Sequence, residues 1–242
     1  MEDIIRSRYP NQFALYTDDE NLDTAREAVD AVKQLQKESG IEATKEMEYR
    51  YLAFSSILQG DTFCVTREGN LTDMDAIQNL MFVPLEDYNK AAGEEKELKP
   101  GEVLLYSNRA AYEYPSMKIF DQKYVVKERL KSFPGNGIIA ANIANTQFLV
   151  MPNMEDIQEL YKKQKEVFTD IAGKIRIYYG FDTRAGEEEQ KEFQKAVYDV
   201  MAKQGYHGNV ESSVEARQGF MGLYGGFFFI GIFLGLLFVM AT

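Results

Sequence analysis

Residues 219–242 read GFMGLYGGFFFIGIFLGLLFVMAT and contain no Lys, Arg, Asp, Glu or His. A helix of this length spans about 36 Å at roughly 1.5 Å per residue, and the hydrocarbon core of a bilayer is about 30 Å thick. All 27 basic and all 38 acidic side chains of the chain lie before Gly219. The sequence therefore predicts a polar domain that is followed by one membrane span.

The net charge and the cysteine count exclude some classes of protein for the polar domain. The formal net charge is −11, which disfavours a nucleic-acid partner because such binding depends on basic side chains that neutralise phosphates. Cys64 is the only cysteine, so no intrachain disulfide can form and the domain depends on packing alone. We expect neither a nucleic acid nor a disulfide framework.

The hydrophobic period changes repeatedly along residues 1–213, which indicates an α+β domain with a mixed sheet and strand-helix-strand units. Helical spacing and caps predict helices, and alternation between turn residues predicts strands. The predicted helices cover 22–39, 73–79, a segment after Pro84, 154–168 and 187–203. The predicted strands cover 13–17, 41–58, 62–66, 80–83, 103–107, 118–130 (bent or broken), 137–143, 147–151, 174–179 and an extended piece after Gly205.

The two ends of the domain resemble each other in the order of their elements. QFALYTDDE, a helix and SGIEATKE follow one another near the start, and KIRIYYGFD, a helix and QGYHGNVE repeat this order near the end. Strand-helix-strand is also the commonest unit of any α+β protein, and this explanation stays open. If the echo is real, two such halves pair in a mixed sheet with the middle section inserted between them.

The glycines of the span predict how it packs. On an ideal helix Gly222 and Gly226 lie about 40° apart, as do Gly231 and Gly235, and the two pairs lie on nearly opposite faces. Small residues spaced in this way let another helix approach closely in lipid. We therefore predict that these four glycines are helix-packing positions and that residues 214–242 form one helix of a larger bundle.

The segment ESSVEARQGFMGLYGGFFFIGIFLGLLFVMAT, residues 211–242, resembles a known family. Its polar lead-in through Arg217, then Tyr224, Gly225 and Gly226, and the Phe and Gly alternation up to Phe238 are similar to one helix of FtsX-like ABC transporter permeases of the bacitracin-resistance (Bce) type. In that family this helix follows the large extracellular domain. The resemblance is specific over these residues, whereas upstream it depends on domain size, Tyr9, Pro10 and strand-helix-strand units.

The resemblance implies a fragment of a multi-pass permease in the cell membrane of a Gram-positive bacterium, with residues 1–213 extracellular and residues 214–242 in the membrane. It implies as partners a separate ATP-binding subunit, a sensor histidine kinase, and a peptide antibiotic or a lipid-linked cell-wall precursor. Two alternatives remain. One is another FtsX-like permease, for lipoprotein release or cell division, and the other is a tail-anchored binding or scaffold protein.

The residue patterns predict no catalytic, cofactor-binding or metal-binding site, so we expect the chain not to be an enzyme. No GxxxxGK[ST] stretch is present, and His207 is the only histidine. Cys64 has no His or basic pair beside it, which predicts an inert thiol. The acidic runs at 18–20 and 187–189 are expected to stabilise helix starts, with a weak cation site as the alternative. The aromatic groups at 112–114 and 178–181 are expected in the core, with a ligand surface as the alternative, and no residue is assigned to ligand binding.

Overall fold

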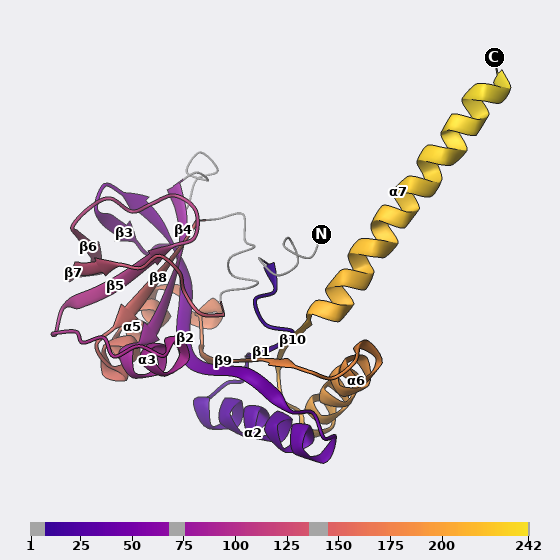
Figure 1. The fold of residues 1–242 in the computed structure, drawn as a ribbon. Coiled ribbons are helices and arrows are strands. Elements are labelled where there is room, and N and C mark those ends of the chain that lie inside the picture. The colour runs from indigo at the N-terminus through magenta and orange to yellow at the C-terminus, as the bar shows by residue number, and fades with distance from the viewer. Residues whose placement is uncertain (1–7, 68–75, 136–144, 242) are drawn as a thin grey trace.

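The computed structural model describes residues 8–67, 76–135 and 145–241, and it confirms an α+β fold with a mixed sheet and one long apolar helix, α7 (Figure 1). The strands are β1 Phe13–Thr17, β2 Ala43–Gln59, β3 Thr62–Cys64, β4 Ile77–Pro84, β5 Glu102–Ser107, β6 Ser116–Ile119, β7 Gln122–Arg129, β8 Asn145–Met151, β9 Ile175–Thr183 and β10 Gly208–Ser212. The helices are α2 Leu22–Glu38, α3 Leu85–Ala92, α5 Met154–Phe168, the short 3-10 turn η2 Thr169–Ile171, α6 Glu187–Gln204 and α7 Ser213–Ala241.

Four strands form an open sheet in the order β10-β1-β9-β2, and all neighbours are antiparallel. The units β1-α2-β2 and β9-α6-β10 are therefore both present, and their strands interleave within one sheet. This is the split strand-helix-strand arrangement of ferredoxin-like sheets, with residues between β2 and β9 inserted. The echo in the sequence is a structural repeat, although its halves share one antiparallel sheet.

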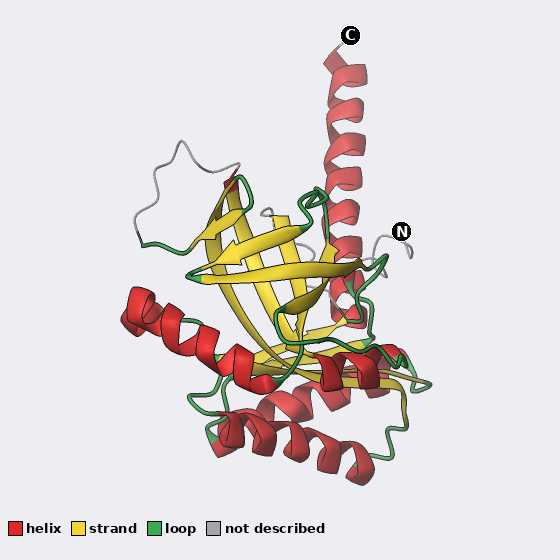
Figure 2. Cartoon of the chain, turned by 90° about the vertical axis from the view of Figure 1, so that its left-hand side faces the viewer, coloured by secondary structure: helices red, strands yellow, loops and turns green. Residues whose placement is uncertain are grey.

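The inserted strands form a closed sheet together with the second half of β2. Successive pairings run β2-β3-β6-β7-β5-β8-β4, and β4 returns to β2. Three of these pairings, β3 with β6, β4 with β8 and β5 with β7, are parallel, which makes the whole sheet mixed. Closure leaves no unpaired edge in this part of the chain. Figure 2 shows the closed sheet standing beside the open sheet.

The long strand β2 belongs to both sheets. Residues from Ala43 to Leu52 pair with β9, and residues from Leu52 to Ile57 pair with β4. The register with β9 shifts between Thr44 and Met47, where Lys45 has a positive φ of 48°. A bulge of this kind increases the local twist of a strand. The two sheets diverge at Leu52, where the pairing with β9 ends and the pairing with β4 begins, and we call the space between them the wedge.

Three buried clusters follow from the alternation of side chains across each strand. One face of the open sheet carries Phe13, Leu15 and Tyr179, which pack against α2 and α6. The closed sheet encloses a second cluster with α5 at its end, and its outer face forms a third cluster with the tyrosines of the open sheet. Burying each aliphatic or aromatic side chain stabilises the fold by about 1.5–3 kcal/mol. Figure 1 shows α2 and α6 on the side of the open sheet away from α7.

The remaining differences from the predicted elements arise where strand pairing overrides local pattern. The helix predicted at 73–79 is wrong for its second half, because β4 begins at Ile77 and pairs with β2 and β8; residues 73–75 lie outside the described residues. The strand predicted at 62–66 ends at Cys64. The strand predicted as bent or broken at 118–130 is indeed broken, into β6 and β7 at Phe120, whose φ is 55°. The strand predicted at 137–143 lies outside the described residues.

Candidate functional site

The strand β10 continues directly into the helix α7, since β10 ends at Ser212 and α7 begins at Ser213. The amide of Ser213 donates to the carbonyl of Gln12 over 2.9 Å, which holds this junction against the start of β1. From α6, Gln194 Nε2 lies 2.5 Å from Glu215 Oε2, and Glu187 forms an ion pair of 2.7 Å with Arg217. The first turn of α7 is therefore fixed to the domain without a linker.

Beyond this first turn, the side chains of α7 are exposed on all sides. Phe227 is 62% exposed and Phe238 is 76% exposed, and the helix is long and apolar enough to cross a membrane. A helix that is apolar around its whole circumference is typical of a membrane span or of a deeply buried core helix. None of its most apolar window is buried among the described residues, which leaves the membrane interpretation.

The four glycines predicted as helix-packing positions lie on this exposed helix. A Cβ atom placed on Gly222, Gly226, Gly231 or Gly235 would meet no described atom within 4 Å. No contact with the described residues therefore explains these four glycines. Their role in helix packing remains a prediction.

Replacing Gly222 and Gly226 with Leu, or Gly231 and Gly235 with Leu, is expected to weaken association of α7 with neighbouring helices by about 1–3 kcal/mol for each pair, because the added side chains separate the helix backbones. The yield of the assembled membrane complex after mild solubilisation measures this loss. The control is the double substitution of Phe229 and Phe233 by Leu, which keeps the same spacing without filling a flat face. Equal yields for all three variants would refute the packing role.

The start of β1 and the end of the edge strand β10 lie at one corner of the open sheet. In the register between β1 and β10, Phe13 lies opposite Ser212, so β1 begins where β10 ends. The start of β1 and the helix that leaves β10 are thereby neighbours, as the labels β1, β10 and α7 show in Figure 1.

Tyrosines fill the junction between the two sheets. The rings of Tyr49 and Tyr178 stack with centroids 4.8 Å apart, and Tyr16 meets Tyr178 edge-on at 4.9 Å. Tyr178 donates to Asn11 Oδ1 over 2.7 Å, and Tyr49 donates to the carbonyl of Gly135 over 2.9 Å. Burial raises the pKa of Tyr178 far above its ordinary value. These hydroxyls therefore act as neutral hydrogen-bond donors that fix the angle between the sheets.

One buried carboxyl group lies close to the tyrosines between the two sheets and to the start of α7, which we call the root of α7. Glu211 on β10 is 8% exposed, and its Oε1 has no hydrogen-bond partner among the described residues. Burial raises the pKa of Glu211 to about 7, although a hydrogen bond with Tyr16 and the charge of Arg8 both lower it. The group thus changes charge near neutral pH at the position where the domain joins the helix. Sequence reasoning missed Glu211, because a single acidic residue in a short strand is usually exposed.

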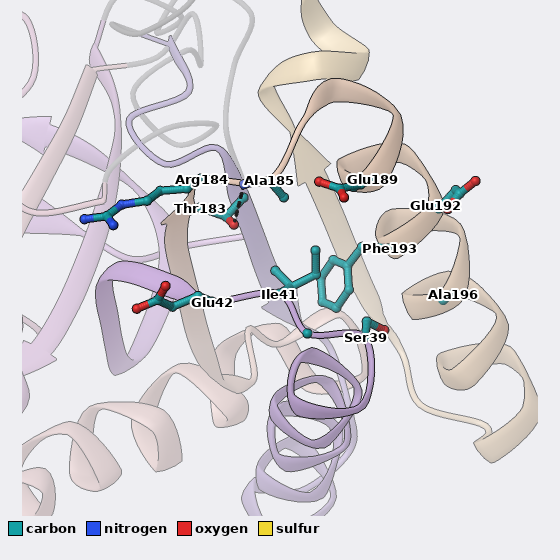
Figure 3. Close-up of a pocket in the computed structure, with 11 residues that line it drawn as sticks. Ser39, Ile41, Glu42, Thr183, Arg184, Ala185, Glu189, Glu192, Phe193 and Ala196 are labelled. Carbon is teal, nitrogen blue, oxygen red and sulfur yellow. Dashed lines mark hydrogen bonds between the residues drawn. The ribbon is translucent and has the colours of Figure 1, made fainter.

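A surface hollow of the described chain lies between the end of α2, the segment after β9 and α6. Its volume is about 600 Å³, and Ile41 and Phe193 lie together at its centre, with Glu42 on one side and Glu192 on α6 on the other (Figure 3). Glu189, at the same rim, instead accepts a hydrogen bond from the Gly186 amide and caps α6. The hollow is open and acidic, and none of its lining groups is a buried polar atom without a partner.

The residues singled out by sequence for chemistry do not assemble into a catalytic or metal site. His207 is exposed, with Nδ1 3.5 Å from Asp19, and Cys64 Sγ lies 3.5 Å from Gln59 Oε1. Among the described residues no three His, Cys, Asp or Glu side chains are placed to hold a metal ion.

The acidic run 18–20 does more than begin a helix. Asn21 caps α2, whereas Asp18 pairs with Arg176 and Glu20 pairs with Lys174. Of the aromatic groups considered as ligand surfaces, Tyr112, Tyr178, Tyr179 and Phe181 are buried in the core, and Tyr114 is 46% exposed.

Comparisons with known proteins add one structural similarity. No family model and no curated protein matches the chain. Among solved structures, the chain is similar to the periplasmic region of MacB from Actinobacillus actinomycetemcomitans, with 12% sequence identity and a TM-score of 0.40, over 89% of this chain and 95% of that chain. At this identity and TM-score the similarity carries no argument about function, which has to be argued from the residues.

Proposed function

We propose that this chain is the external domain and the following membrane helix of an ABC transporter permease subunit of the FtsX-like, bacitracin-resistance (Bce) type. The observation that carries the proposal is the root of α7. An apolar helix exposed on all sides leaves β10 without a linker, beside the first residue of β1. A movement of the membrane helices would therefore reach the open sheet directly.

The sequence of residues 211–242 supports the finer assignment, because it resembles the helix that follows the extracellular domain in that family. On this proposal residues 1–213 lie outside the cell, α7 belongs to a multi-pass bundle, and the host is a Gram-positive bacterium. ATP hydrolysis belongs to a separate subunit, and the chain itself is not an enzyme. The external domain handles a peptide antibiotic or a lipid-linked cell-wall precursor and communicates with a sensor histidine kinase.

The first test determines on which side of the membrane the domain lies, and it uses the protein in intact cells. In a Cys64→Ser background, Glu95→Cys places a thiol on an exposed loop, and Ser56→Cys places one at a buried position as the matched control. A membrane-impermeant maleimide added to intact cells is expected to label position 95 and to leave position 56 unlabelled. Labelling of position 95 only after lysis would place the domain in the cytosol and support the tail-anchored scaffold instead.

The partner and the client are tested separately. Affinity purification of the native complex is expected to recover an ATP-binding subunit, and loss of the gene is expected to lower resistance to bacitracin-like peptides. Recovery of the ATPase without any change in resistance would favour another FtsX-like permease, for lipoprotein release or cell division. Recovery of no ATPase would contradict the transporter assignment.

A further inference from the structure

A cavity lies in the wedge where β2 leaves the open sheet and joins the closed sheet. Its volume is about 330 Å³, and its walls include Tyr16, Tyr51, Ala53, Met81, Thr146 and Arg176. These residues come from β1, β2, β4, β8 and β9, so both sheets contribute. The cavity lies within the volume range of small-molecule sites and is a consequence of the divergence of the sheets at Leu52.

Two polar atoms of the residues that line this cavity have no hydrogen-bond partner in the described part of the chain. Thr146 is 0% exposed, and its Oγ1 makes no hydrogen bond. Arg176 Nε is also buried and unpaired, while the terminal nitrogen of the same guanidinium lies 2.6 Å from Asp18. Leaving a buried polar group unpaired costs about 1–3 kcal/mol, so each of these two atoms is expected to have a partner that the described residues do not supply. The cavity has room for roughly ten groups of the size of a water molecule.

The surroundings of these two atoms restrict the chemistry of the occupant. Ala53, Phe54, Leu80 and Met81 supply an apolar wall. The charge of Arg176 is already balanced by Asp18, and Lys174 is likewise paired with Glu20. An added anion would meet the carboxylate of Asp18, and an added cation would meet the guanidinium of Arg176. An uncharged hydrogen-bond acceptor with an apolar substituent avoids both repulsions.

We propose that the wedge cavity binds a neutral amide through its carbonyl oxygen, which accepts from Arg176 Nε and Thr146 Oγ1, and that the apolar substituent of the amide lies against Met81 and Ala53. This chemistry occurs in an apolar residue of a peptide and in an acyl chain joined through an amide. The inference depends on the cavity and does not depend on the transporter assignment. Arg176 and Thr146 lie on strands that are far apart in the sequence, and both line this cavity.

The experiment uses the full chain in lipid nanodiscs with carbon-13 in its methionine methyl groups. Titration with N-acetyl-leucine amide represents the peptide, and titration with hexanamide represents the acyl amide. The methyl signal of Met81 is expected to shift and saturate with a dissociation constant on the order of 1 mM, as befits a small ligand. The methyl signal of Met154, which begins α5 and packs against the core cluster of the closed sheet, is expected to stay unchanged. The tighter of the two probes identifies the natural source.

Two variants separate binding from folding. Thr146→Val keeps the shape but removes the hydroxyl, so it is expected to weaken binding about tenfold while leaving the fold at least as stable. Ala53→Leu fills the cavity and is expected to abolish the Met81 shift. Thr62→Val, on a strand of the closed sheet away from the cavity, is the matched control and is expected to bind as the unchanged chain does.

Three results would overturn the proposal. The first is the absence of a Met81 shift with either amide at concentrations about tenfold above the expected constant. The second is unchanged binding in both Thr146→Val and Ala53→Leu. The third is equal or tighter binding of hexanoate or hexylammonium, which would show that the site selects a charge.

Discussion

Glu211→Gln is expected to make the folded chain more stable than the unchanged protein by about 3 kcal/mol above pH 7, and equally stable below about pH 4.5. Burial raises the pKa of Glu211 from 4.5 to about 7, even though Tyr16 and Arg8 act in the opposite direction. Between these two values the folded state holds a proton that the unfolded state has lost. The stability that Glu211 contributes is therefore complete below about pH 4.5 and is lost as the pH rises to about 7.

Denaturant unfolding of both proteins in nanodiscs, followed by the tyrosine circular dichroism signal from about pH 4.5 to about pH 8, measures this difference. Glu48→Gln is the control of opposite sign. Although burial raises the pKa of Glu48, its contacts with Lys33 and Arg26 lower it overall, so that variant is expected to lose stability at neutral pH. An identical pH slope for Glu211→Gln and the unchanged protein would show that Glu211 is not held in a buried site.

Gly173→Ala is expected to destabilise the domain by about 3 kcal/mol, which is the upper end of the usual cost of overpacking. A Cβ atom at this position would lie 2.2 Å from the backbone carbonyl oxygen of Ala53, which belongs to β2 and cannot rotate away. The side-chain amide of Gln164 also bonds to both the amide and the carbonyl of Gly173, so this segment cannot shift to relieve the overlap. The substitution forces the start of β9 away from β2.

The midpoint of denaturant unfolding measures this cost, and Gly219→Ala is the matched control. No described atom lies within 4 Å of a Cβ at Gly219, which is in α7, so that change is expected to be neutral or slightly stabilising. A Gly173→Ala midpoint equal to that of the control would mean that β2 and β9 are not packed as closely as the structure places them. The same variant should enlarge the wedge cavity, since Ala53 forms part of its wall.

The local hydrophobic pattern was sufficient to predict most of the individual helices and strands. The helical spacing of Ala25, Val29 and Val32 predicted α2, and the alternation in residues 41–58 predicted β2, because each pattern depends on neighbours within the same segment. The helix predicted at 73–79 was wrong for its second half because distant strands, and not neighbours in the same segment, decide its structure. Residues from Ile77 onward are fixed by pairing with β2 and β8, which are far away in the sequence.

The candidate sites also differ in whether one segment of sequence is enough to recognise them. The four glycines of α7 could be located from sequence because a membrane span needs only its own apolar length to be recognised. Glu211, Arg176 and Thr146 could not be assigned a role, since each is ordinary in its own segment. Their importance arises from burial and from unpaired atoms that only the assembled sheets produce.

By itself, the sequence determined that these 242 residues contain an acidic α+β domain and one uncharged helix long enough to cross a membrane, because composition and period are local properties of the chain. The tertiary structure decided that β2 is shared by an open and a closed sheet, that β10 continues into α7 beside the start of β1, and that a cavity lies where the sheets diverge. These features depend on strand register between distant segments. Register follows from the simultaneous burial of many side chains, which no single segment encodes.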